Sequence, residues 1–177
     1  MTSAGRQDQT LPMDTFSQRF KNTAFVRLFA FWKIPLLWWV QPTVIEMSEN
    51  RTELKIPLTR RTKNHLNSMY FGALGIGAEV AIAAIAVKTI ADSKKPVDFL
   101  FKDFSGKFLK RGDGDVHFIC DQGQAVKALI HKAIASGERE EATFQSYAVV
   151  PKKDPTAHIG EFTLTMSCKL RQKKPKA

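Results

Sequence analysis

The chain has 177 residues, of which 44% are hydrophobic and 25% charged. This length suits one domain, and the composition excludes both a wholly disordered chain and a protein with several membrane spans. Lys and Arg outnumber Asp and Glu by 27 to 17, and the resulting net charge of +10 favours anionic partners such as nucleotides, nucleic acid or membrane surfaces.

The N-terminal part is predicted to form a helix after a disordered start. Residues 1–14 are expected to be disordered. Residues 1–10 are polar, and no apolar stretch of the signal-peptide type precedes residue 24, so we expect a cytoplasmic protein. Thr15 and Gln18 form a capping-box pattern, and apolar residues then recur near helical spacing, which predicts an amphipathic helix over 15–33. Pro35 ends it. The apolar segment 34–40 is predicted to cover a core or a dimer interface, with contact to lipid as the alternative.

A long apolar helix is the central feature of the sequence. Alternating residues predict a hairpin of strands at 43–47 and 52–58 before it. Between Phe71 and Val87 the only polar side chain is Glu79, so the helix is apolar on all faces and must be enclosed by protein or by lipid. A central Glu is costly in a bilayer, and strand-like sequence flanks the helix, so we expect a sheet wrapped round it.

The second half of the chain is predicted to supply the rest of this sheet. Aromatic residues over 97–110 indicate a strand, and residues 112–115 are predicted to turn it into a second hairpin with a strand at 116–120. A short helix at 122–136, on the edge of the sheet, and strands at 142–150 and 158–170 follow. We therefore expect one α+β domain over residues 15–171 and a disordered basic tail at 172–177.

Residues at the start of the long helix resemble a known motif. In PaaI-like thioesterases of the hotdog superfamily, an Asn precedes a His-Gly-Gly by six residues and a catalytic Asp or Glu by fifteen. Here Asn64 precedes Tyr70-Phe71-Gly72 by six and Glu79 by fifteen. The stretch 108–116 also resembles the phrase that follows the helix in these proteins, without its usual proline. The likeness spans about residues 43–170 and is greatest to an uncharacterised branch with Tyr-Phe-Gly.

The resemblance implies a hotdog fold, an acyl-CoA or similar thioester as the substrate, and a homodimer or a dimer of dimers. Glu79 would be the base or the nucleophile, with a pKa raised by burial in the apolar helix. Free amides of Phe71 or Gly72 at the helix N-terminus would form the oxyanion hole. Asn64 would orient the water or the carboxylate, and Tyr70 would donate a hydrogen bond where the family has its histidine.

Coenzyme A, as part of the substrate, is the only cofactor-like group expected. Its phosphates would contact Lys110 and Arg111, together with Arg60 and Arg61. No metal site is expected, because the histidines lack ligand spacing and Cys120 and Cys168 lie far apart.

Three function classes remain open at this point. The first is a thioester hydrolase. The second is a non-catalytic protein that binds acyl-CoA or lipid, in which Glu79 is a spectator, for example a buried acid paired across a dimer, and Asn64 only caps the helix. The third uses the basic surface on anionic membranes, helped by Trp32, Trp38 and Trp39, or on RNA, although nucleic acid is the less expected partner.

Overall fold

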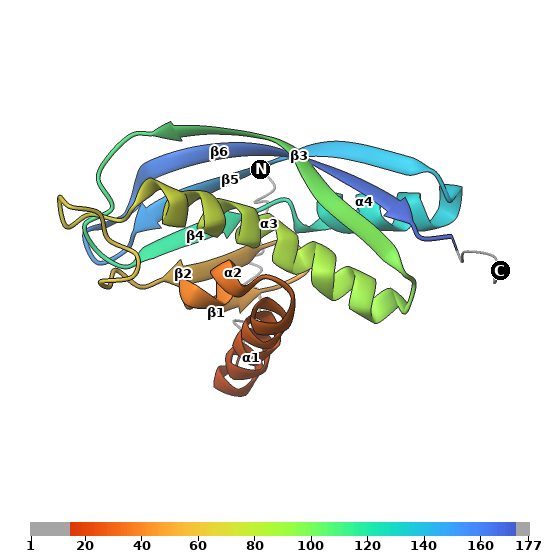
Figure 1. The fold of residues 1–177 in the computed structure, drawn as a ribbon, viewed down its shortest axis with the longest axis horizontal. Helices are drawn as coiled ribbons and strands as arrows, with labels where there is room; N and C mark the ends of the chain where they lie inside the picture. The colour runs from red at the N-terminus through yellow and green to blue at the C-terminus, as the bar shows by residue number, and fades with distance from the viewer. Residues whose placement is uncertain (1–14, 173–177) are drawn as a thin grey trace, which may run out of the picture.

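The elements form in the order that the sequence predicts. The structure is a computed structural model that describes residues 15–172, and a six-stranded antiparallel sheet curves round one long helix in it (Figure 1). The helices are α1 (Phe16–Lys33), α2 (Pro35–Trp39), α3 (Phe71–Ser93) and α4 (Gly123–Ser136). The strands are β1 (Thr43–Met47), β2 (Thr52–Ile56), β3 (Val97–Phe108), β4 (Val116–Cys120), β5 (Arg139–Val150) and β6 (Asp154–Leu170). The α+β class is therefore confirmed, whereas the predictions for residues 1–14 and for the tail from 173 lie outside the described residues.

The predicted second hairpin is wrong. The strands lie in the order β1-β2-β4-β5-β6-β3, so β4 pairs with β2 and β5, and β3 pairs only with β6, from Val97 opposite Leu170 to Phe108 opposite Gly160. The segment 109–115 is a crossover, not a tight turn. Gly112 accepts a hydrogen bond from the Met69 amide (2.7 Å), and the Asp115 carboxylate accepts one from the Leu58 amide (3.0 Å). The Gly-Asp sequence thus binds the backbone just before α3 and just after β2 through these hydrogen bonds.

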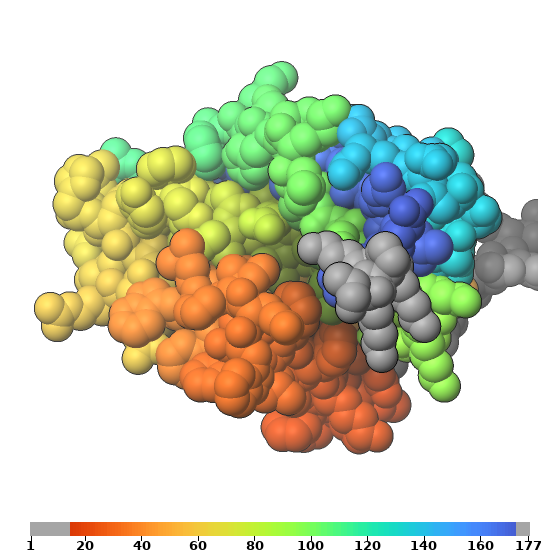
Figure 2. Space-filling model, turned by 45° about the vertical axis from the view of Figure 1, so that its right-hand side comes forward, coloured from red at the N-terminus to blue at the C-terminus, as the bar shows by residue number. Residues whose placement is uncertain are grey.

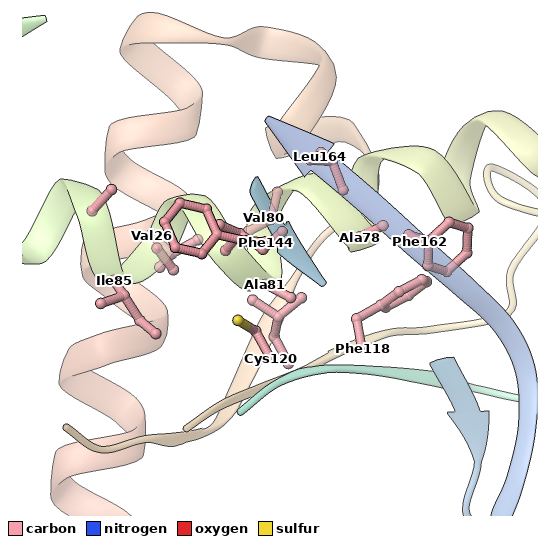
Figure 3. Close-up of a cluster of buried hydrophobic side chains, with 14 of the residues drawn as sticks. Val26, Ala78, Val80, Ala81, Ile85, Phe118, Cys120, Phe144, Phe162 and Leu164 are labelled. Atoms are coloured by element: carbon pink, nitrogen blue, oxygen red, sulfur yellow. The ribbon is translucent and has the colours of Figure 1, made fainter. Parts of the chain in front are cut away.

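Small residues let α3 lie close to the sheet. Gly77 faces Phe118 of β4, and a Cβ atom at Gly77 would lie less than 3.0 Å from three atoms of the fully buried Phe118 ring. Figure 3 shows Phe118 and Phe162 beside Ala78, with Val26 reaching the same core from α1. By length and composition alone α3 is apolar enough to cross a membrane, but 61% of that apolar stretch is buried inside the protein. The sheet therefore provides most of the enclosure predicted for an all-apolar helix and leaves one face of α3 uncovered.

Helix α3 runs six residues beyond the apolar stretch that ends at Val87. The last turns are stabilised by an ion pair between Lys88 and Asp92 (3.0 Å) and by the Thr89 hydroxyl, which donates to the Ile85 carbonyl. Lys94 then ends the helix in the left-handed region, with φ of 54°. The hydrophobic pattern marks the enclosed part of the helix and leaves this polar end unpredicted.

The N-terminal helices pack along the β1 edge of the sheet. Thr15 caps α1 by accepting a hydrogen bond from the Gln18 amide (3.4 Å), as predicted. The Val44 amide of β1 donates to Thr23 of α1 (3.0 Å), and the Arg27 guanidinium donates to the Pro42 carbonyl (2.9 Å). In the segment 34–40, Leu37 and Val40 are buried and complete the core, while the other residues are exposed.

Candidate functional site

An apolar groove of about 900 Å³ opens on the face of α3 that the sheet leaves free. Its walls come from three parts of the chain that are distant in sequence: the α1–α2 segment, α3 and β3. In Figure 2 the atoms of α3 lie between the orange atoms of α1–α2 and the green atoms of β3. The lining side chains are almost all apolar or aromatic and include Phe25, Phe29, Ile34, Phe71, Ile76, Val80, Phe99, Phe104 and Phe108.

The packing of α3 on the sheet directs Glu79 into this groove. Gly77 contacts Phe118, and the Ala78 carbonyl accepts a hydrogen bond from the buried Ser146 hydroxyl of β5 (3.2 Å), so this side of the helix faces the sheet. Successive helical residues are rotated by about 100°. The side chain of Glu79 consequently turns away from the sheet and lines the groove.

Glu79 is a carboxylate without a partner. The groove has two other charged side chains, but Lys102 pairs with Glu141 (2.7 Å), and Asp103 accepts a hydrogen bond from the Thr165 amide (3.1 Å). Within residues 15–172, Glu79 forms no hydrogen bond or ion pair. Burial raises the pKa of its carboxyl group above the ordinary value, because the charged form loses hydration in the groove. A carboxylate with a raised pKa is a stronger proton acceptor than an ordinary Glu side chain.

The start of α3 supplies hydrogen-bond donors to the same groove. Tyr70 is the N-cap residue, and its side chain makes no capping hydrogen bond. The amides of Phe71 and Gly72 donate to no group in the described part of the chain, and both residues line the groove. Free amides at a helix N-terminus lie in a positive field and can bind an oxyanion.

Asn64 and Tyr70 do not line the groove. The Asn64 side-chain oxygen accepts hydrogen bonds from the amides of Leu66 (2.9 Å) and Ser68 (3.2 Å) and from the Ser68 hydroxyl, which holds the loop before α3. The alternative hypothesis that Asn64 caps α3 is wrong, because Tyr70 is the N-cap residue of this helix. The Tyr70 ring covers Gly72 and makes an edge contact with Phe71, with 4.9 Å between the ring centroids.

The four basic residues proposed for phosphates lie on two exposed segments that flank the start of α3. The loop carrying Arg60 and Arg61 is held next to the start of α3 by a hydrogen bond from the Tyr70 amide to the Thr62 carbonyl (2.8 Å). The segment carrying Lys110 and Arg111 is held next to the start of α3 by a hydrogen bond from the Met69 amide to the Gly112 carbonyl (2.7 Å). Lys110 and Arg111 line a second pocket of about 330 Å³, together with Asp113, Val150, Lys153, Asp154, Ala157 and Ile159.

Two walls of the groove were not predicted from the sequence. Phe25, Phe29 and Ile34 of the N-terminal segment line the groove; Ile34 was expected to cover a core or a dimer interface, or to touch lipid, and no role was predicted for the two phenylalanines. The β3 wall was missed because its aromatic residues were assigned to a hairpin. Apolar residues on both faces of 97–108 were the available signal, because such a strand needs contacts on both sides. Residues 15–172 contain no group of three His, Cys, Asp or Glu side chains placed to hold a metal ion.

One protein-family model matches most of the chain. A family model described as a domain of unknown function (DUF4442) matches residues 22–157. Among curated protein sequences none matches the chain.

Three solved structures of hotdog proteins are similar to this one. A protein of unknown function and probable thioesterase from Pseudomonas aeruginosa has a TM-score of 0.68 at 19% identity, covering 84% of this chain and 96% of that one. A thioesterase family protein from Silicibacter pomeroyi has a TM-score of 0.58 at 16% identity, covering 84% and 99%. The E. coli PaaI protein from the phenylacetic acid degradation operon has a TM-score of 0.55 at 12% identity, covering 86% and 95%. At these identities the likeness shows the fold, and it confirms the hotdog fold that residues 64–79 indicated.

Proposed function

We propose that this chain, which belongs to the family described as a domain of unknown function (DUF4442), hydrolyses acyl-CoA thioesters. The observation that carries the proposal is Glu79, an unpaired carboxylate with a raised pKa in a groove otherwise lined by apolar side chains. Such a charge is costly to keep in an apolar site unless it is used. The groove is large enough for an acyl chain, since ligand sites typically measure about 300–1,000 Å³.

Glu79 activates the attacking group in this reaction. As a general base it accepts a proton from water while the water oxygen bonds to the thioester carbonyl carbon. The tetrahedral oxyanion then expels the coenzyme A thiolate, which takes up a proton, and the carboxylic acid is released. As a nucleophile, Glu79 would attack the carbonyl carbon and expel the coenzyme A thiolate, and water would then hydrolyse the resulting anhydride to the free acid and the Glu79 carboxylate.

The oxyanion is stabilised by amides from a second protomer. Phe71 and Glu79 lie eight residues apart on α3, which is about 12 Å along a helix, so one chain cannot bring both to the same carbonyl group. A partner helix can supply the amides of Phe71 and Gly72 opposite Glu79. The proposed site therefore lies between two copies of the chain.

The free edge of β3 supports this dimer. One side of β3 pairs with β6, and its other side pairs with no strand among the described residues. Exposed Leu100, Phe104 and Phe108 lie on this strand. A long apolar edge strand left open would aggregate, whereas pairing with the same strand of a second copy would cover it and close the groove.

Coenzyme A phosphates bind beside the start of α3 in this proposal. Lys110 and Arg111 on one segment and Arg60 and Arg61 on the other are exposed and flank that end of the helix. Their charges attract phosphate, and the acyl group enters the groove beyond Phe71.

An acyl-CoA panel tests the proposal. Release of free coenzyme A from short, medium and aryl acyl-CoAs is measured at neutral pH for the wild type and for Glu79→Gln. We expect a fall in kcat of at least about 100-fold, since general acid–base catalysis typically contributes that much or more. Glu138→Gln, an exposed position outside the groove, is the matched control and should leave the rate unchanged. No hydrolysis by the wild type across the panel, or equal rates for both Glu79 forms, would contradict the proposal.

A second candidate is a protein that binds acyl-CoA or lipid without turnover. The observation that favours it is Tyr70-Phe71, which stands where the resembling thioesterases have His-Gly and leaves the groove without a histidine. Binding without release of coenzyme A, at an affinity that Glu79→Gln does not change, would identify this function.

A further inference from the structure

Helices α1 and α2 expose an unusual amount of apolar surface. The side chains of Phe16, Phe20, Leu28, Trp32 and Leu36 are 87%, 69%, 62%, 73% and 62% exposed, whereas large aromatic residues are normally mostly buried. We call the group the aromatic face, and it comprises Phe16, Phe20, Leu28, Phe31, Trp32, Leu36, Trp38 and Trp39. A contiguous apolar patch of this kind marks an interaction site.

The aromatic face lies on the outer side of α1. Asn22, Val26 and Ala30, spaced four residues apart, are the buried residues of α1. The side chains of Phe16, Phe20, Leu28 and Trp32 follow the same spacing on the opposite side of the helix. Phe31 joins Trp32 and Trp38 into one aromatic cluster, with ring centroids 5.4 and 5.6 Å apart. The face therefore extends from α1 onto α2 without interruption.

Positive charge surrounds this face, and acidic residues are absent from it. Residues 15–45 contain no Asp or Glu but include Arg19, Lys21, Arg27 and Lys33. Lys21 and Lys33 are exposed, and the Arg61 guanidinium lies 4.7 Å from the centre of the Trp39 ring. Lys and Arg beside Trp, Phe and Leu on one helical surface are typical of segments that lie in the interface of an anionic bilayer.

We propose that the aromatic face of α1 and α2 docks on the surface of an anionic lipid bilayer. A second copy of the chain fits this surface less well. A symmetric contact would bring Lys21, Lys33 and Arg61 of one copy against the same residues of the other, without an acidic residue in 15–45 to pair with them. Lipid headgroups supply the negative charge, and the acyl boundary accepts the aromatic rings. The proposed catalytic dimer uses β3, at the opposite edge of the sheet from β1 on which α1 packs.

Docking would place the groove beside the bilayer. Phe25 and Phe29 of α1, and Ile34 between α1 and α2, line the groove. An acyl chain dissolved in the membrane could then enter without crossing water. This last step rests on the proposed function, whereas docking itself does not require turnover.

Intrinsic fluorescence gives a direct test, because all three tryptophans of the chain, at positions 32, 38 and 39, belong to the aromatic face. The full chain is mixed with vesicles of phosphatidylcholine, with or without 30 mol% phosphatidylglycerol. We expect a blue shift of tryptophan emission and co-sedimentation with the anionic vesicles, both reduced by 1 M salt. Emission should also be quenched by lipids brominated near the top of the acyl chain, which reports insertion of the rings.

Matched variants separate the apolar and electrostatic contributions. Phe20→Ser with Leu28→Ser should weaken vesicle binding at least about tenfold, because the variant removes two apolar side chains that would be buried among the lipid chains. Leu109→Ser, an exposed residue outside α1 and α2, should have no effect. Lys21→Glu with Lys33→Glu should weaken binding to a similar degree, and Lys132→Glu on α4 is its control. Circular dichroism confirms that each variant is folded.

Three results would overturn the proposal. The first is no retention on anionic vesicles at low salt. The second is equal retention of the wild type and the Phe20/Leu28 variant. The third is a particle mass that halves in light scattering when Phe20 and Leu28 are replaced, which would assign the aromatic face to contacts between copies of the chain.

Discussion

Two glycines of α3 should respond in opposite ways to the same substitution. A Cβ at Gly77 would meet three atoms of the Phe118 ring at less than 3.0 Å, and the fully buried ring has no space to move into. A Cβ at Gly75 would meet only Phe104, at 3.8 Å, which is ordinary contact. Replacing Gly by Ala inside a helix stabilises it by about 1 kcal/mol. Gly75→Ala should therefore stabilise the protein by up to about that amount.

At Gly77 the same gain is outweighed by the clash. Overpacking a core costs typically about 1–3 kcal/mol, and three ring atoms place Gly77→Ala at the upper end, so the net destabilisation is about 2 kcal/mol. For a chain of this size this corresponds to a Tm lowered by about 4–8 °C. Thermal unfolding followed by circular dichroism measures both variants, and size-exclusion chromatography checks that their assembly is unchanged. A Gly77→Ala variant as stable as Gly75→Ala would refute the close approach of α3 to β4.

The remaining predictions concern the pH dependence of Glu79 and the loop of Asn64. Because burial raises the pKa of Glu79, the folded protein binds the proton of this side chain more tightly than the unfolded chain does. The wild type should therefore lose stability relative to Glu79→Gln as the pH rises above 4.5, the ordinary pKa of a Glu side chain. Melting curves from pH 4 to 8 measure this difference, and a wild type more stable than the variant at pH 8 would instead indicate a cationic partner for Glu79. Asn64→Ala removes three hydrogen bonds that hold the loop before α3 and should cost about 1–2 kcal/mol in urea unfolding. The control is Leu66→Ala, an exposed position in the same loop, which should change the stability little. Asn67 is not suitable as a control, because its backbone is in the left-handed region, with φ of 58°.

Local patterns predicted most elements of this fold. The capping residue Thr15, the alternation in β1 and β2 and the single charge in an apolar helix each act within one element or between neighbours in sequence. The pairing of β3 was mispredicted, because a Gly-Asp sequence is equally suited to a tight turn and to a crossover. The choice depends on Met69 and Leu58, which bind the crossover from distant positions.

The candidate site was predictable only where a local pattern in the sequence marks a residue. Glu79 is conspicuous because no other polar side chain lies between Phe71 and Val87, and its placement in a groove follows from the packing of the residues before it. Asn64 matched a motif spacing, yet its side chain holds a loop, because three donors lie within four residues of it. The groove walls contributed by α1 and β3 come from segments about 70 residues apart in the sequence, so no local pattern shows that they line the same groove.

The sheet order also determines when the groove can form during synthesis. β3 has no strand partner until β6 is complete, and the pairing reaches Leu170, close to the end of the chain. A nascent chain therefore carries β3 as an unpaired aromatic strand until β6 has been made, which is about 60 residues later. A protein truncated before β6 should remain bound to chaperones or aggregate, because β3 would have no strand to pair with, even though α3 already packs on β2, β4 and β5.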